Sequence, residues 1–297
     1  MSTIHLAVML EETMLALDVQ PGGSYVDATL GGATHTEALL KRSEPDGHVY
    51  SFDVNPKALL AAAQRLTASG DRWAGIEANF RFLDRELEAA GVMPGSIDGI
   101  LCDLGFSSDE MADPSTGLSF QLEGPLDMRL GPKSNDDGLT ASDIVNTWKP
   151  NEIETMIRNF GEEKFASRIV DEIVKARKIA RITRTTELAS LIKQAVPQSY
   201  EQGRIHPATR TFQALRIAVN DELEALKDFM NASHRMLKPG GRLAIISFHS
   251  LEDRIVKHAF LTDEWEALTK RPAEASPFEV QANPRARSAK LRVAIKK

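Results

Sequence analysis

Short apolar runs alternate with helical patterns over residues 24–110, and this alternation predicts the fold class. The runs are bounded by Gly, Pro, Asn or Asp, as buried strands are, and they cover Tyr25–Leu30, Val49–Val54, Gly75–Ala78 and Gly99–Leu104. Thr34–Arg42 and Pro56–Ala68 are spaced like amphipathic helices. Strands that alternate with helices predict an α/β domain, in which a parallel sheet has helices on both faces.

A long interruption separates these runs from the next one. Arg242–Phe248 follows only after about 140 residues, far more than one crossover connection requires. Residues 105–140 are rich in Gly, Pro, Ser and Asp and predict a long loop, whereas residues 141–200 hold three helical patterns, Glu152–Phe160, Lys164–Lys178 and Thr186–Ala195. We therefore expect one domain made of residues 1–107 and 208–297, with a helical domain of residues 108–207 inserted into it.

The C-terminal part of the chain is expected to complete the sheet. Pro207–Met236 and Leu251–Phe260 predict helices, and Pro239-Gly240-Gly241 predicts a turn between the first of them and the strand at Arg242–Phe248. Residues 289–297 alternate apolar and basic side chains, which is the pattern of a half-buried final strand.

Charge is divided unevenly along the 297 residues, although the net charge of −6 is unremarkable. Residues 1–160 hold 11 Lys and Arg against 25 Asp and Glu, a net −14, and residues 161–297 hold 25 against 17, a net +8. The acidic total therefore does not argue against a nucleic-acid partner, because phosphate binding depends on local clusters of cations.

Cys102 is the only cysteine, so an intrachain disulfide is excluded and a cysteine-based zinc site is not expected. No apolar run approaches the roughly 18 residues that span a bilayer. Ordinary fractions of hydrophobic (42%) and charged (26%) residues indicate a globular protein. We expect a cytoplasmic protein that is not bound to a membrane.

The first predicted strand runs into a glycine pair, Asp27-Ala28-Thr29-Leu30-Gly31-Gly32, just before a helix. Such a turn lets the backbone approach a ligand, although a plain strand-to-helix turn has the same pattern. Asp53 ends the second strand, where a carboxylate can accept hydrogen bonds from ribose. The third glycine of a dinucleotide-binding loop is replaced by Thr36, so S-adenosylmethionine, which has no pyrophosphate, is the favoured cofactor.

Six stretches in order carry a family resemblance that covers nearly the whole chain: DATLGGATH from Asp27, DLGFSS from Asp103, GPLDMR from Gly124, HPATRTFQALRIAVN from His206, ISFHSLEDRIVK from Ile246 and NPRARSAKLRV from Asn283. The chain resembles the ribosomal RNA small subunit methyltransferase H family, bacterial enzymes that methylate N4 of a cytidine in the decoding centre of 16S rRNA. The resemblance implies a class I S-adenosylmethionine-dependent methyltransferase fold, a helical insert that recognises the substrate, and 16S rRNA or the 30S subunit as partner. It also implies that a homodimer can form.

The resemblance further implies a set of cofactor contacts, at Ala33, Thr34, His35, Asp53, Phe80, Asp103 and Glu110. The family usually has Gly-Gly-His where this chain has Ala33-Thr34-His35, and Gln in place of Glu110. If the loop requires a left-handed conformation at Thr34, the substitution costs roughly 1 kcal/mol or more.

Asp103 is the expected catalytic residue. Methyl transfer to an amine is an in-line displacement that needs alignment and no metal, and a carboxylate that accepts the N–H of the amine helps to align it. Asp103 ends a strand and Phe106 follows three residues later, where it either stacks on an extruded base or makes a simple apolar contact. A turn carboxylate remains the alternative for Asp103. His249 also follows a strand, with a substrate-orienting role and a structural hydrogen bond both open.

Two basic segments are candidates for RNA contact. Lys164–Arg184 holds seven basic residues against Asp171 and Glu172, and Pro284–Lys297 holds six and no acid. A solvated charged face is the alternative. We expect Arg285 and Arg287 to contact rRNA. Two rival functions remain: an RNA-binding ribosome-assembly factor with a degenerate cofactor loop, and a methyltransferase for a small molecule or a protein.

Overall fold

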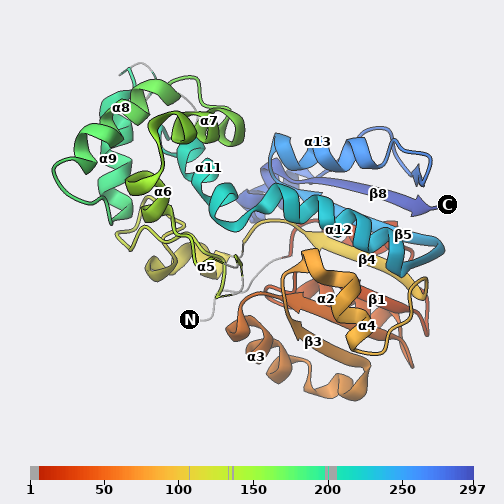
Figure 1. Ribbon diagram of the computed structural model, residues 1–297. Helices are drawn as coiled ribbons and strands as arrows, with labels where there is room; N and C mark the ends of the chain where they lie inside the picture. The colour runs from red at the N-terminus through yellow and green to blue at the C-terminus, as the bar shows by residue number, and fades with distance from the viewer. Residues whose placement is uncertain (1–6, 107, 133, 136, 198–199, 201–205) are drawn as a thin grey trace. The chain divides into compact units, whose positions relative to one another are not determined.

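The computed structural model in Figure 1 describes residues 7–106, 108–132, 134–135, 137–197, 200 and 206–297. These residues form two compact units, Met1–Ser107 with Leu223–Lys297 and Ser108–Glu222. The second unit is continuous in sequence and interrupts the first after residue 107. The helix α11 (Thr209–Asn220) belongs to this inserted unit and packs closely against its helix α7 (Pro150–Gly161).

The first unit is built on an eight-stranded sheet in the order β3-β2-β1-β4-β5-β8-β6, with β7 paired to β8. Its first five strands are parallel, as expected: β1 (Ser24–Asp27), β2 (His48–Asp53), β3 (Trp73–Glu77), β4 (Ile97–Asp103) and β5 (Leu237–Ser247). The last three are antiparallel to their partners: β6 (Trp265–Ala267), β7 (Ala273–Glu274) and β8 (Lys290–Lys296). The chain thus has the mixed α/β fold that the sequence predicts.

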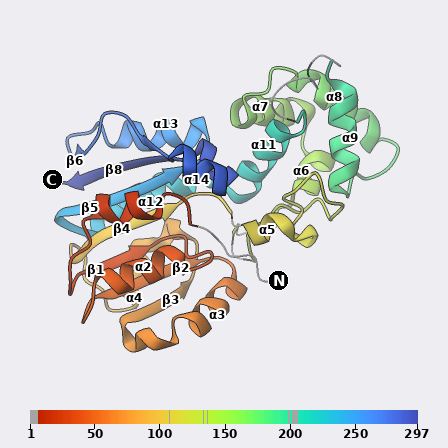
Figure 2. The same cartoon turned by 180° about the vertical axis from the view of Figure 1, so that it is seen from behind.

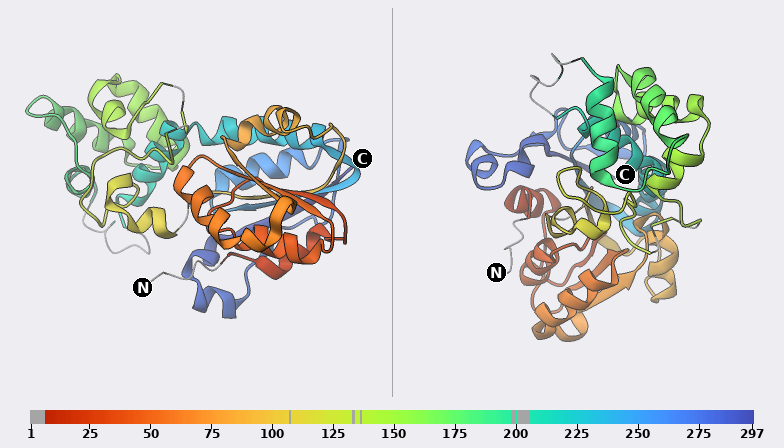
Figure 3. Two further views of the ribbon diagram at one scale, coloured as in Figure 1. Left: turned by 90° about the horizontal axis from the view of Figure 1, so that it is seen from below. Right: turned by 90° about the vertical axis from the view of Figure 1, so that its left-hand side faces the viewer.

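Helices cover both faces of this sheet (Figures 2 and 3). One face packs on α4 (Leu83–Ala89), α12 (Glu222–Met236) and α13 (Ser250–Ala259). The other packs on α1 (Leu10–Leu17), α2 (Thr34–Arg42), α3 (Pro56–Arg65) and the segment that holds α14 (Pro277–Ala282). Alternate residues of β4 and β5 face opposite layers, and both sets are apolar, which explains why these strands read as continuous hydrophobic runs.

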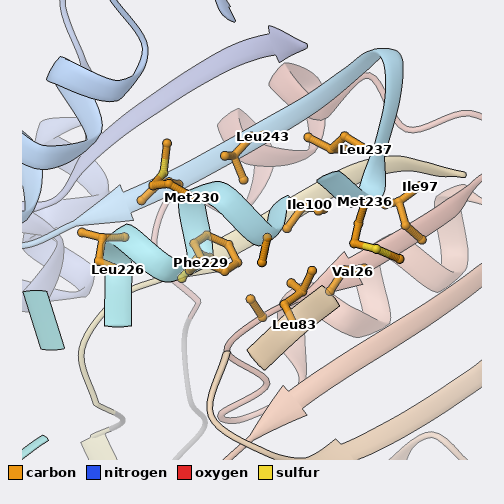
Figure 4. Packing of buried hydrophobic residues seen from close by; sticks show 14 of the residues in the cluster. Val26, Leu83, Ile97, Ile100, Leu226, Phe229, Met230, Met236, Leu237 and Leu243 are labelled. Atoms are coloured by element: carbon orange, nitrogen blue, oxygen red, sulfur yellow. The ribbon is translucent and has the colours of Figure 1, made fainter. Parts of the chain in front are cut away.

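The core of the first face is centred on α12 (Figure 4). Phe229 and Met230 of this helix lie against Ile100 of β4 and Leu243 of β5, with Leu83 of α4 in the same cluster. Phe229 is fully buried. These contacts hold β4 and β5 side by side although the whole insertion separates them in the sequence.

The inserted unit is helical, as expected. Besides α7 and α11 it contains α5 (Ser108–Ala112), α6 (Ala141–Thr147), α8 (Ala166–Arg177) and α9 (Thr185–Ala195). A Cβ on Gly161 would lie 2.5 Å from the carbonyl oxygen of Arg210, so glycine is needed where α7 approaches α11. Asn220 fixes the loop before α6, since its Oδ1 accepts from the N–H of Leu130 and its Nδ2 donates to the carbonyl of Met128.

Three local predictions were wrong. The single helix predicted over residues 207–236 is broken at Asp221, whose φ of 49° is left-handed. The strand β5 begins at Leu237 instead of Arg242, because Leu237 pairs with Ile97 and Gly240 takes a φ of 81° within the strand. The last strand is buried on both faces and not half-buried: Arg292 is 8% exposed and pairs with Asp253 at 2.7 Å.

Helices α1 and α4 were not predicted, since each is short, with eight residues in α1 and seven in α4. Both pack on the sheet, α1 through Met14 and Leu17 and α4 through Leu83 and Leu87. Among the described helices, none combines the length and the hydropathy that crossing a membrane requires.

Replacing Phe229 with Ala should destabilise the first unit strongly. The side chain is fully buried between α12 and the sheet, and removing it leaves a cavity that costs about 3–5 kcal/mol. Urea unfolding followed by circular dichroism measures the change. Phe278→Ala is the matched control, because Phe278 is 81% exposed and its loss should shift the midpoint little. Equal shifts for both variants would contradict the assigned core.

Candidate cofactor site and catalytic loop

Three aspartates end neighbouring parallel strands, and they therefore lie at one edge of the sheet. Asp27 is the last residue of β1, Asp53 of β2 and Asp103 of β4. Phe80 follows β3 at the same edge, packing edge-on against Phe229 with ring centroids 5.4 Å apart. Ligands of open parallel sheets bind outside the carboxyl ends of the strands, so this edge is the candidate site.

The glycine loop after β1 is held by hydrogen bonds that its backbone N–H groups donate to the second strand. The N–H of Leu30 donates to the carbonyl of Phe52 at 2.8 Å, and the N–H of Gly31 donates to Asp53 Oδ2 at 3.0 Å. The other oxygen of Asp53 accepts from the N–H of Asn55 at 2.8 Å. Each carboxylate oxygen has two lone pairs, so Asp53 can fix the loop and still accept from a ribose hydroxyl.

Besides Gly31, whose φ is 46°, the left-handed position of this loop is Ala33 and not Thr34. Ala33 has φ 62° and ψ 14°, whereas Thr34 is the first residue of α2. A left-handed alanine costs about 1 kcal/mol. Its methyl group is 1% exposed within the apolar layer, and burying a methyl contributes about 0.8 kcal/mol. Packing therefore offsets most of the strain, and the loop keeps its turn with an alanine at this position.

Thr36 stands where a dinucleotide loop has its third glycine, and its hydroxyl has a structural partner. Thr36 Oγ1 donates to Asp27 Oδ2 at 2.7 Å, and the other oxygen of Asp27 accepts from the N–H of Thr29 at 3.2 Å. Asp27 is fully buried, and burial raises its pKa to about 7. Asp27 therefore ties the start of α2 to the end of β1 and faces away from solvent.

Asp103 has the environment expected of a reactive carboxyl group. Its side chain is 18% exposed, its Oδ2 lies 4.0 Å from His35 Nδ1, and its buried Oδ1 accepts no hydrogen bond from any described residue. Burial raises the pKa of Asp103 to about 8; the charge of Asp27 adds to the rise and the Arg285 guanidinium opposes it. A carboxyl group in this state fits a ligand with a positive charge, such as the sulfonium or amino group of the expected cofactor.

The loop after Asp103 is fixed at both ends. The N–H of Leu104 donates to the carbonyl of Ile246 at 2.9 Å, and Gly105 takes a φ of 103°. The guanidinium of Arg285 donates to the carbonyl oxygen of Phe106 and lies 5.8 Å from the centroid of its ring. Arg285 therefore holds the loop that follows Asp103, a contact that the sequence did not predict when Arg285 was paired with Arg287 as an expected RNA contact.

His249 caps a helix. It is the N-cap of α13, its Nδ1 accepts from the N–H of Glu252 at 3.4 Å, and its Nε2 lies 3.0 Å from Glu252 Oε1. The carboxylate of Glu252 also accepts from the N–H groups of Phe248 and His249, at 2.8 and 3.2 Å. Of the two roles open for His249, these contacts favour the structural one.

Glu110 lies in the inserted unit, on α5, where its carbonyl oxygen accepts from Thr116 Oγ1 at 3.0 Å. The basic residues of the same unit are largely engaged in it. Arg181 pairs with Asp143 at 2.6 Å, Lys175 with Glu172 at 2.7 Å, and Arg177 donates to two backbone carbonyls. The basic segment Lys164–Arg184 is therefore less available to phosphates than its charge suggests.

Comparison with known proteins places the chain in a family. The model of the MraW methylase family matches residues 2–297. A protein named ribosomal RNA small subunit methyltransferase H from Symbiobacterium thermophilum is 44% identical over 98% of this chain and 96% of its own length. A protein of the same name from Synechococcus sp. is 47% identical over 98% of this chain and 92% of its own length. Another from Geobacter sulfurreducens is 44% identical over the full length of both chains.

Likeness to solved structures is much weaker. An rRNA methylase from Streptococcus thermophilus covers 99% of each chain at 16% identity, with a TM-score of 0.44. The assignment therefore rests on sequence, where the family model and the relatives agree over nearly the full length. The chain belongs to the MraW methylase family.

Proposed function

We propose that this chain transfers a methyl group from S-adenosylmethionine to N4 of a cytidine in the decoding region of 16S rRNA, within the small ribosomal subunit. The chain is a methyltransferase, and S-adenosylmethionine is its cofactor. The carboxyl group of Asp103 carries the proposal, because it lies at the end of β4 and its buried Oδ1 accepts no hydrogen bond from the described residues. The choice of base and of rRNA region rests on the six sequence stretches that resemble this family.

In the proposed in-line transfer, each of the described site residues has a separate role. When bound, the cofactor supplies a methyl group on a positively charged sulfur. The Gly31 loop and Asp53 hold the nucleoside, and helix α2 starts beside it at Ala33, Thr34 and His35. Asp103 accepts an N–H of the cytosine amine, which aligns the nitrogen, and takes up its proton after transfer. Phe106 offers an apolar surface to the base.

The remaining parts of the proposal follow from the same resemblance. Phe80 and Glu110 are proposed as further cofactor contacts, and residues 108–207 as the part that recognises the RNA. The 30S particle is proposed as the substrate, the cytoplasm as the place of action, and a homodimer as the form in solution. Light scattering measures the last of these.

The two rival functions are less well supported. A degenerate cofactor loop would have lost its turn, yet Ala33 is left-handed and Gly31 bonds to Asp53. A methyltransferase for a small molecule or a protein would leave the relatives' full-length similarity unexplained, since those proteins are named for ribosomal RNA.

The assay that tests the proposed function uses 30S subunits from a strain that lacks this modification. We expect the chain, with labelled S-adenosylmethionine, to transfer one methyl group, found as N4-methylcytidine in a decoding-region fragment by mass spectrometry. Asp103→Asn should lower the rate by about 10²-fold or more, because it loses the proton acceptor. A methyl group at another base, or none, would overturn the proposal.

Cofactor affinity should depend on pH through Asp103. Its pKa of about 8 keeps the carboxyl largely protonated at pH 7 when the site is empty, and a bound cation favours the carboxylate. Affinity should therefore rise with pH below about 8, by at most about tenfold per unit. Calorimetry at pH 7 in buffers of different ionisation enthalpy should show proton release. Asp103→Asn should abolish the release and Asp53→Asn should keep it; release that persists without Asp103 would refute the assignment.

Arg285 is proposed as a positioning residue for Asp103 and Phe106. Its positive charge lowers the pKa of Asp103, so Arg285→Ala should move the rising limb of the pH–rate profile to higher pH. Arg285→Lys should move it less, because the charge is kept. Arg287→Ala is the matched control from the same segment and should leave the limb in place. An unmoved limb in Arg285→Ala would show that the residue acts on stability alone.

A further inference from the structure

A cavity of about 290 Å³ lies beside the catalytic loop and has no part in the mechanism above. It opens where β5 ends and α13 begins, and β8 with the preceding turn forms its other side. The residues that line it include Phe248, Ser250, Glu274, Arg287, Ser288 and Lys290. All of them belong to the first unit.

The charges around this cavity leave one cation uncompensated. Lys290 lies opposite Glu274 in the β7–β8 ladder, and its Nζ is 3.4 Å from Asp253 Oδ2. Arg287 makes no ion pair, hydrogen bond or ring contact with any residue that the structure describes, and its side chain is exposed. The cavity lining thus holds two cations, Arg287 and Lys290, against one acid, Glu274, and this excess of one positive charge suits a ligand with a single negative charge.

The other groups on the wall are suited to the same kind of ligand. Ser250 and Ser288 bring hydroxyl groups, which donate to phosphate oxygens. The carboxylate of Glu252 is withdrawn from the cavity, since it is 4% exposed and accepts from the N–H groups at the start of α13. The cavity therefore combines an arginine, a lysine and two hydroxyls with one acid, Glu274.

The position of the cavity relates it to the transfer site. A Cβ built on Gly105 would lie 3.9 Å from the ring of Phe248, so the cavity wall touches the loop that begins at Asp103. Arg285 and Arg287 are two residues apart and face different partners: Arg285 binds the carbonyl of Phe106, and Arg287 lines the cavity. An RNA strand whose target base reaches Asp103 would place a neighbouring nucleotide along this wall of the cavity.

We propose that the cavity binds the phosphodiester group of a nucleotide close to the methylated one, with Arg287 as the main contact. The inference rests on the proposed function and deepens it, because it gives the RNA backbone a defined site on the catalytic unit. Each such contact releases counterions, so its loss lowers both the affinity and its dependence on salt.

The experiment measures methyl transfer to unmodified 30S subunits at several salt concentrations. Arg287→Ala should raise the KM for 30S subunits by roughly 3- to 10-fold and reduce the slope of log(kcat/KM) against log[salt] by about 1, leaving the KM for S-adenosylmethionine unchanged. Arg287→Lys should recover part of the loss, since a lysine keeps the charge but not the fork of donors. Arg85→Ala is the matched control: this exposed arginine lies on α4 and pairs with Glu86.

Each outcome decides a separate point. An unchanged KM for 30S subunits in Arg287→Ala, or a loss equal to that in Arg85→Ala, would overturn the inference while methylation by the wild-type chain upholds the proposed function. A raised KM for S-adenosylmethionine would assign the cavity to the cofactor and also overturn it. Absence of transfer by the wild-type chain would overturn the proposed function itself.

A free phosphate ion is the other source of the same chemistry. Inorganic phosphate is titrated against the 30S substrate at constant ionic strength. If the cavity binds RNA, phosphate should compete weakly with 30S subunits for the wild-type chain. Arg287→Ala should then weaken the binding of phosphate and the binding of 30S subunits. Phosphate binding that depends on Arg287, with 30S affinity independent of it, would assign the cavity to a small anion and contradict the inference.

Discussion

β4 lies at the centre of the sheet with apolar layers on both of its faces, and the properties of the site depend on this burial. Its alternate residues pack on α12 on one side and on the layer of α1 and α2 on the other. Asp103, the last residue of the strand, emerges at the edge with little water around it. The same packing that fixes the strand therefore raises the pKa of the carboxyl group at its end.

Other charged residues of the site determine how far the pKa of Asp103 rises. Asp27 ends the adjacent strand, and its charge makes ionisation of Asp103 harder, whereas Arg285 makes it easier. Arg285 is brought there by the antiparallel β8, which follows the turn that contains it. The C-terminal addition to the sheet thus supplies the counter-charge that a parallel sheet alone would lack, and it also anchors Phe106.

The fold class could be predicted from the sequence because it depends on local patterns. Asp53 and Asp103 end strands within one residue of the predicted ends, whereas β1 ends at Asp27, three residues before the predicted end at Leu30. The strained position could not be predicted, since whether Ala33 or Thr34 is left-handed depends on where α2 starts. Arg285 lies 179 residues from Phe106, and no spacing rule connects them. The break at Asp221 is equally hidden, because both flanking segments are helical.

The late arrival of β5 has a consequence for how the chain folds during synthesis. Cys102 of β4 pairs beside Ile245 of β5, so about 140 residues must leave the ribosome before the centre of the sheet can close. Until then the apolar edge of β4 has only β1 as a neighbour, and such edges favour aggregation. The inserted unit is continuous in sequence and rich in local helical contacts, which form quickly. Early folding of this unit would replace a long flexible connection by a compact one, which lowers the entropic cost of pairing β5 with β4 and shortens the time that this edge is exposed.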